Sequence, residues 1–267
     1  MTLLAILVGT LVAGIGSVWV AAWLSFGILS RYTQHMLSLA AGALMATSFL
    51  HLLPEAFESE AGAHQLFLTL LLGLVFFFLL DKAELWHHGH EHGHGHDHGH
   101  HEHHAHASHG TVSEQTPRGQ WAVLAGDSVH CFGDGILIAS AFMADMRLGV
   151  IASLAVLAHE VPHHMGDLAV LRQGSSSRRA AIVKVSMAGA ITAFGGAVGY
   201  VLVDALHDWL PFFLVVASSS FVYVALADLI PQLQKRLSAR ETAAQIFWLG
   251  VGMGMVVLIS AVAGHSH

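Results

Sequence analysis

The sequence predicts an all-α polytopic membrane protein, and three observations support this fold class: the composition, eight apolar runs and the placement of the basic residues. Of the 267 residues, 54% are hydrophobic and only 11% are charged, whereas a soluble domain contains about a quarter charged residues. Apolar runs recur along the whole chain, and a transmembrane helix needs roughly 20 such residues. We therefore expect a single transmembrane domain that occupies residues 1–267.

Eight apolar runs predict eight transmembrane helices. The runs span about 2–29, 36–57, 64–84, 120–144, 148–171, 181–205, 210–232 and 243–264. No basic region precedes the first run, so we interpret it as a membrane helix and not as a signal peptide. The third run is apolar on all sides, which is typical of a helix that faces lipid. Small residues such as Gly189, Gly196 and Gly252 in the sixth and eighth runs favour close helix packing, within the chain or in a homodimer.

The Lys and Arg residues predict how the bundle is oriented. If both termini are extracytoplasmic, ten of the 11 Lys and Arg residues lie on the cytoplasmic side and only Arg147 lies outside. The reverse orientation would violate the excess of Lys and Arg that cytoplasmic loops show. We therefore expect an integral membrane protein, in the cell (inner) membrane, with both termini extracytoplasmic.

Residues 85–119 form the one long segment outside the predicted helices. From His87 to His109 this segment contains 13 histidines interleaved with Gly, Glu and Asp. Such a composition cannot build an apolar core, so we expect disorder in the absence of metal. By the orientation above the segment is a cytoplasmic loop, suited to weak binding of zinc or similar ions at many positions. The alternative is a polar linker that is merely solvated.

The fifth run contains the most unusual stretch, HEVPHHMGD at residues 159–167. Ionisable side chains at membrane depth are costly, so they are usually paired, hydrated or bound to metal. His159 and His163 are four residues apart and share a helix face. Further ionisable residues recur at spacings of three and four: Glu160, His163, His164 and Asp167. Imidazole nitrogens and carboxylate oxygens are ligands of divalent first-row metals, zinc above all, so we predict a metal site here.

A second polar stripe lies in the fourth run. Its members recur at spacings of three and four: Asp127, His130, Cys131 and Asp134. One helix cannot surround an ion, but two facing helices can, and Asp134 with Glu160 would balance the two positive charges. The chain has a single cysteine, which excludes an internal disulfide and a multi-cysteine metal site. Alone, Cys131 is typical of a small buried residue; within this stripe it is also a candidate ligand.

Two further sets of candidate ligands lie near helix ends. His51 and Glu55 are four residues apart at the end of the second run. They could form a station for the ion near the outer face, or simply face water at the interface. Asp228 precedes Pro231 in the seventh run and is expected at the inner mouth of the pathway.

Taken together, these motifs resemble the ZIP family of divalent-metal transporters. The similarity is greatest to the branch with HNFxDG in helix four and HExPHExGD in helix five, and HLLPEA at 51–56 and YVALADLIP at 223–231 also look familial. The resemblance covers the whole chain. It implies an inverted 3+2+3 repeat, in which the first three and last three helices surround helices four and five. It also implies five metal ligands: His130, Asp134, His159, Glu160 and His163.

Two departures from the pattern of this branch bear on the site. The asparagine of helix four is Cys131 here, and the glutamate after the second histidine of helix five is His164. If either faces the ion, softer sulfur and nitrogen donors would favour zinc and cadmium over manganese. The alternative is that both side chains point at neighbouring helices. Some family members hold two ions, and whether this chain holds one or two stays open.

The expected function is transport of Zn2+ into the cytoplasm, with Cd2+, Fe2+ and Mn2+ as alternative ions. We expect neither an enzyme nor a nucleic-acid partner, and no nucleotide-binding loop is visible that would couple transport to ATP. One alternative is an intramembrane zinc protease, because residues 159–163 fit HExxH. Another is a metal/proton exporter of the six-helix kind, which also has a histidine-rich cytoplasmic loop.

Overall fold

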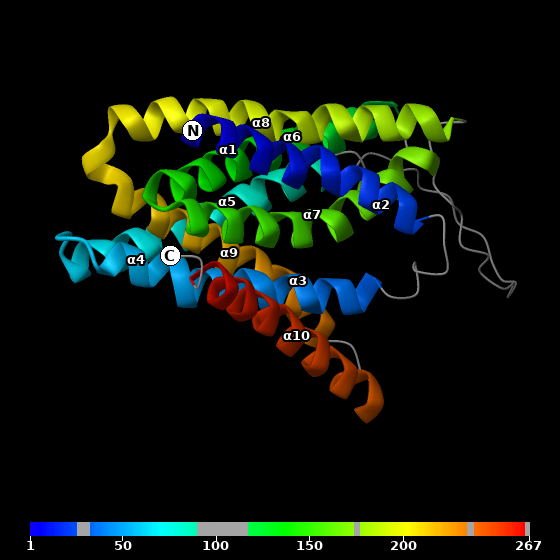
Figure 1. Cartoon of the computed structure of the whole chain (residues 1–267). Helices are drawn as coiled ribbons and strands as arrows, with labels where there is room; N and C mark the ends of the chain where they lie inside the picture. Colours follow the sequence, from blue (N-terminus) through cyan, green and yellow to red (C-terminus); the bar gives the residue numbers. More distant parts are fainter. Residues whose placement is uncertain (26–32, 90–116, 174–176, 234–237, 265–267) are drawn as a thin grey trace, which may run out of the picture.

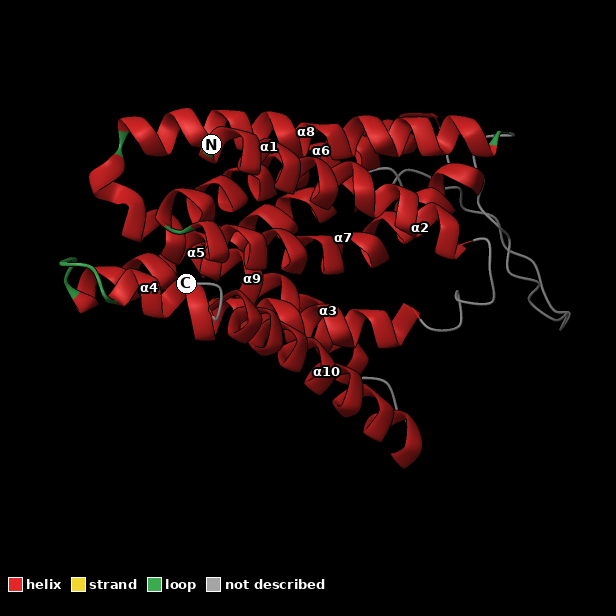
Figure 2. Ribbon diagram, in the orientation of Figure 1, coloured by secondary structure: helices red, strands yellow, loops and turns green. Residues whose placement is uncertain are grey.

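Eight helical rods make up the part of the chain that a computed structural model describes, namely residues 1–25, 33–89, 117–173, 177–233 and 238–264 (Figures 1 and 2). These described residues contain no strand. In chain order the rods are α1 (Thr2–Leu11) continued by η1 (Val12–Gly16) and α2 (Ser17–Ser25); α3 (Thr33–Thr47) continued by η3 (Ser48–Leu52) and α4 (Leu53–Phe57); α5 (Ala63–Gly89); α6 (Pro117–Ala144); α7 (Met146–Gln173); α8 (Arg178–Ala205); η5 (His207–Trp209) leading into α9 (Leu210–Leu233); and α10 (Ala239–Gly264). The predicted number of helices is confirmed.

Six of the described rods are long and apolar enough to cross a membrane, as judged by length and composition. The two that are not, α6 and α7, have 28 residues each and carry the ionisable stretches in their middle. Both lie against other helices: α6 packs most extensively against α8, and α7 contacts α2, α3 and α6 (Figure 1). The most polar helices therefore lie inside the bundle, whereas the apolar α5 is largely exposed along its surface.

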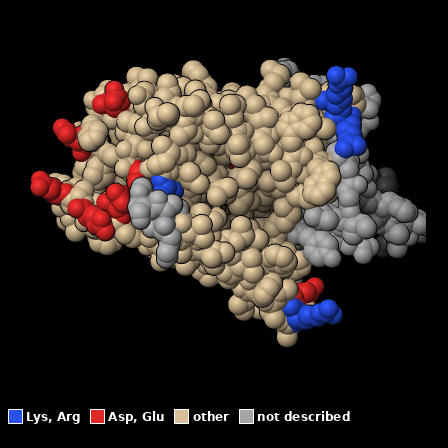
Figure 3. Space-filling model, viewed as in Figure 1, with Lys and Arg blue, Asp and Glu red and all other residues tan. Residues whose placement is uncertain are grey.

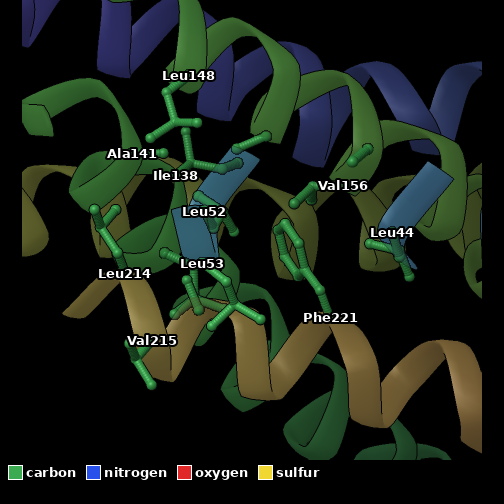
Figure 4. Close-up of a cluster of buried hydrophobic side chains, with 14 of the residues drawn as sticks. Leu44, Leu52, Leu53, Ile138, Ala141, Leu148, Val156, Leu214, Val215 and Phe221 are labelled. Carbon is green, nitrogen blue, oxygen red and sulfur yellow. The ribbon is translucent and has the colours of Figure 1, made fainter. Parts of the chain in front are cut away.

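Two apolar clusters lie on either side of the ionisable stretch of α7. One contains Val156 together with Leu52, Ile138 and Phe221 from η3, α6 and α9 (Figure 4). The other contains Leu168, with further members from α2, α6 and α8. The backbone around the ionisable stretch is thus held in packed surroundings at both ends.

Helices α5 and α6 extend into the predicted histidine-rich segment of residues 85–119. Helix α5 continues to Gly89 and α6 already begins at Pro117, so the structure places both ends of that segment in helices. Residues 90–116, which include most of its histidines, lie outside the described residues.

In the described part of the chain, two helical rods contain a π-helical turn that the sequence did not predict. These are η1, between α1 and α2, and η3, between α3 and α4. Such turns are frequent at functional sites because they shift the side chains that follow. The first is followed directly by Ser17, which contacts the candidate metal centre described below.

Glycines in α6 and α8 allow these two helices to pack backbone against backbone. A Cβ atom on Gly135 would collide with the backbone of Thr192 and Gly196, and one on Gly195 with that of Phe132. Gly189 and Gly196 are likewise covered, by residues of η1 and α1. The glycines of α8 thus pack against other helices of the same chain. This face of α8 is therefore not available for the homodimer contact that the sequence allowed.

We expect Gly135→Ala to destabilise the bundle by about 1–3 kcal/mol, because the added methyl group meets backbone atoms that cannot rotate away. Gly133→Ala is the matched control on the same helix, since no atom lies within 4 Å of the place its Cβ would occupy. Thermal unfolding of the two purified variants checks this. Equal melting temperatures would show that α6 and α8 are not packed this closely.

Candidate metal centre

Helices α6 and α7 form an antiparallel hairpin that brings the two polar stripes together. Asp145 is the single residue between them, and its Oδ1 accepts hydrogen bonds from the backbone N–H groups of Arg147 (2.8 Å) and Leu148 (3.1 Å). This satisfies N–H groups at the start of α7 that have no partner within the helix. The sharp turn places α7 alongside α6, so that His130 and Asp134 of α6 lie 3.1–3.2 Å from Glu160 and His159 of α7.

The first group of side chains, called here the His130 cluster, contains His130, Asp134, His159 and Glu160. The Nε2 atom of His159 lies 3.1 Å from Asp134 Oδ2 and 3.2 Å from Glu160 Oε1. The Nε2 atom of His130 lies 3.2 Å from the same Glu160 oxygen. Two imidazoles and two carboxylates around one point are a donor set suited to zinc.

The second group, the Cys131 cluster, contains Asp127, Cys131, Glu160 and His164, all of them buried. His164 Nε2 lies 3.0 Å from Glu160 Oε2 and 3.6 Å from Asp127 Oδ1. The Cys131 Sγ atom lies 3.6 Å from Asp127 Oδ1 and 3.8 Å from Glu160 Oε2. Both residues that depart from the family pattern therefore have a donor atom in the same group.

Glu160 belongs to both clusters, with one oxygen toward each. Its Oε1 atom faces the His130 cluster and its Oε2 atom faces the Cys131 cluster. A carboxylate in this position can bridge two cations. The two clusters are thus two potential metal-binding groups that share one ligand.

Several buried polar atoms in these clusters have no hydrogen-bond partner. They are Asp127 Oδ2, Asp134 Oδ2, Glu160 Oε1 and His164 Nε2. Three of them nevertheless lie 3.0–3.2 Å from an ion-pair partner in the same group. A buried polar group without a partner costs about 1–3 kcal/mol. A cation at the point these atoms surround would satisfy all four, including Asp127 Oδ2, for which the described residues provide no hydrogen bond.

A third group, the Asp167 cluster, contains Asp127, His163 and Asp167. His163 Nδ1 lies 3.3 Å from Asp167 Oδ2 and 3.6 Å from Asp127 Oδ1. The resemblance placed His163 with the ligands of the His130 cluster, but the structure brings only the other four of that set together. The His163 ring stacks against that of His130, with centroids 5.3 Å apart, so it lies beside the His130 cluster and not within it.

Sequence reasoning missed Ser17, the first residue of α2. Its hydroxyl donates a hydrogen bond to the Gly14 carbonyl (2.5 Å), and its Oγ atom lies 2.9 Å from His164 Nδ1. Because the Ser17 hydroxyl hydrogen is donated to Gly14, the Ser17 oxygen accepts a hydrogen bond from Nδ1–H of His164. The other ring nitrogen, Nε2, then carries no hydrogen and is free for the Cys131 cluster. A lone serine in an apolar run gives no signal of this kind, and the contact spans 147 positions of sequence.

The remaining predicted ligands are not part of these groups. His51 lies partly buried in η3 and Glu55 is exposed in α4, and neither joins a potential metal-binding group among the described residues. The side chain of Asp228 lies outside the described part of the structure.

The geometry differs from that of an HExxH protease. In that motif the two histidines bind one zinc and the glutamate acts as a base outside the ligand set. Here His159 and His163 belong to different groups, and Glu160 lies among the ligands of two of them.

The fold and these ligand groups define a helical integral membrane protein with buried candidate sites for divalent metal ions. Residues 83–260, more than half of the chain, match the family described as ZIP Zinc transporter, and the chain belongs to this family.

Individual relatives agree with this assignment. The zinc transporter ZIP4 of Homo sapiens is 30% identical over 258 residues, which cover 78% of this chain and 40% of ZIP4. The zinc transporter ZIP10 of Danio rerio is 35% identical over 153 residues, which cover 54% of this chain and 18% of ZIP10. The chain thus spans less than half the length of these two relatives. Both are named as transporters, which does not support the protease alternative.

Proposed function

We propose that this chain transports Zn2+ across the membrane into the cytoplasm through the His130 and Cys131 clusters between α6 and α7. The observation that supports this most directly is the bridging position of Glu160, within an apolar bundle, between two sets of metal ligands. Two adjacent sites with a shared ligand let an ion move in small steps without losing all its ligands at once. Cd2+, Fe2+ and Mn2+ are further candidate ions.

Uptake of Zn2+ by liposomes that contain only the purified protein tests this proposal, with the other divalent ions as competitors. We expect zinc to accumulate inside the liposomes without ATP. If liposomes with the protein accumulate no more zinc than empty liposomes, the transport function is wrong.

The charge distribution supports an orientation with both termini outside the cytoplasm. Asp and Glu side chains gather at the end of the bundle where α1 begins, and Lys and Arg side chains mainly at the opposite end (Figure 3). The exception is Arg147 at the start of α7, whose guanidinium group donates hydrogen bonds to Ser260 of α10. Cytoplasmic loops are rich in Lys and Arg, so we assign the basic end, with residues 90–116, to the cytoplasm.

Helix contacts support the inverted 3+2+3 repeat. A two-fold operation that exchanges the first three rods for the last three pairs α3 with α9 and α5 with α10. It would therefore convert the α5–α9 contact into the α10–α3 contact, and both contacts are extensive. It would also convert the packing of α6 against α8 into that of α7 against α1 and α2, which is also present. The HEVPHHMGD stretch favours the branch with HExPHExGD, with His164 as its one difference.

Deleting residues 90–109 is expected to leave zinc uptake within about twofold of the parent, because a polar, histidine-rich segment cannot line a pathway through the bundle. The response of uptake to zinc on the loop side should change, since the deletion removes most of the chelating histidines. A Gly/Ser segment of equal length is the control for chain connectivity. Loss of uptake by correctly inserted protein would make the segment part of the pathway.

A further inference from the structure

The three ligand groups form a connected series along the α6–α7 hairpin. The His130 and Cys131 clusters share Glu160, and the Cys131 and Asp167 clusters share Asp127. Each step from one group to the next therefore keeps one carboxylate in common. The first two groups are the candidate transport site, which leaves the third without an assigned role.

We propose that Asp127, His163 and Asp167 form a third cation site, the station at which a divalent ion leaves the buried clusters on its way to the cytoplasmic end. The site would take a borderline divalent ion such as Zn2+, bound by one imidazole and two carboxylates. Its role as an exit station rests on the proposed transport function, but the existence of the site does not.

The donor atoms of this group are close enough for one ion, and one buried oxygen among them has no hydrogen bond. All three residues offer ligand atoms within 4.8 Å of one another. The Oδ2 atom of Asp127 is buried and without a hydrogen-bond partner, and the Asp127 side chain is 1% exposed. Two carboxylates balance the charge of a divalent ion, and the unpaired oxygen of Asp127 is the feature that a bound cation would satisfy.

Exposure is greatest in this group. The His163 side chain is 45% exposed and that of Asp167 13%. In the His130 cluster His130 alone is partly exposed, at 27%, and every member of the Cys131 cluster is buried. An ion at the Asp167 cluster would retain water molecules as additional ligands, so it would be held more weakly than in the Cys131 cluster. Passage through a pore requires sites weak enough for the ion to leave, which is the property expected at an exit.

The position of the group along the hairpin points to the same end of the bundle. On α6, Asp127 lies seven residues before Asp134, roughly 10 Å nearer the start of the helix. On α7, Asp167 lies eight residues after His159, nearer the end of that helix. Since the two helices are antiparallel, both displacements lead toward the end where α8 begins with Arg178 and Arg179.

Cobalt binding by the full-length purified protein tests the proposal, because Cys131 is the sole cysteine of the chain. Co2+ bound to a thiolate gives a near-ultraviolet charge-transfer band, so the band reports the Cys131 cluster, while equilibrium dialysis counts all bound ions. We expect Asp167→Asn to lose one Co2+ per chain relative to the parent and to keep the band unchanged. Histidines of the 90–116 segment bind equally in both proteins and cancel in the difference.

Two further variants make the result decisive. Asp167→Glu keeps a carboxylate and is expected to retain the ion, and Asp204→Asn, an exposed carboxylate near the end of α8, is expected to lose none. If Asp167→Asn binds as many Co2+ ions as the parent, or loses the band together with the ion, the separate third site is wrong. Failure of the transport proposal would appear differently, as unimpaired uptake by a Glu160 variant.

Discussion

Replacing Glu160 by glutamine is expected to abolish most zinc uptake. The amide has nearly the same size, but it removes the charge and turns one of two ligand oxygens into a donor, so both the His130 and the Cys131 clusters are damaged by one change. Loss of a residue that merely supports a ligand already lowers metal affinity 10–100-fold, so we expect uptake to fall by at least about tenfold. Initial rates of uptake in liposomes provide the measurement.

The matched control is Glu60→Gln, a glutamate that is exposed in the turn before α5. It should transport at close to the parental rate. Glu160→Gln removes the charge that faces the imidazoles of His130, His159 and His164, so some loss of stability is expected and uptake is compared only in protein that is folded and inserted. Normal uptake by Glu160→Gln in protein that is correctly inserted would remove both clusters from the pathway.

Single changes of the other four expected ligands should also strongly reduce uptake. These are the alanine variants of His130, Asp134, His159 and His163. For His163 the reason differs, because the structure places it in the Asp167 cluster, next to His130 and not among its partners. Near-normal uptake by the double variant His130→Ala with His163→Ala would contradict the whole assignment.

Exchanging the two departing residues for those of the family pattern should weaken the preference for zinc over manganese. In the structure Cys131 and His164 face the same cluster, together with Asp127 and Glu160. Cys131→Asn and His164→Glu replace a sulfur and a nitrogen donor by oxygen donors, which suit manganese and iron(II) better. For the combined variant we expect the ratio of zinc to manganese uptake to fall by about tenfold, which corresponds to ~1.4 kcal/mol.

Competition uptake of zinc against manganese provides the measurement for both single variants and the pair. His207→Glu, an exposed histidine in η5, controls for a general effect of added negative charge. An unchanged ion preference in all three variants would remove Cys131 and His164 from selectivity, while the remaining ligands would be unaffected.

The sequence predicted the rods and the facing stripes because both depend on local spacing. Apolar runs of sufficient length define the helices directly, and the single residue between α6 and α7 makes these helices antiparallel neighbours. Spacings of three and four place Asp127, Cys131 and Asp134 on one face of α6 whatever surrounds them. The same spacing places Glu160 and His164 on one face of α7.

The remaining features depend on tertiary contacts, which spacing does not determine. The resemblance assigned His163 to the ligands of the His130 cluster. Which carboxylates its ring contacts depends on the packing of the helices, and here these are Asp127 and Asp167. The role of Ser17 depends on the π-helical turn before it and on the packing of α2 against α7. Which residues cover the α8 glycines likewise depends on the packing of neighbouring helices.

Anomalous X-ray diffraction at the zinc absorption edge, on crystals of the zinc-loaded protein, locates the bound ions themselves. We expect zinc between α6 and α7, within about 2.3 Å of ligand atoms, with one ion on each side of the Glu160 carboxylate when both clusters are filled. Strong zinc peaks confined to the surface of the bundle, with none between these two helices, would contradict this expectation.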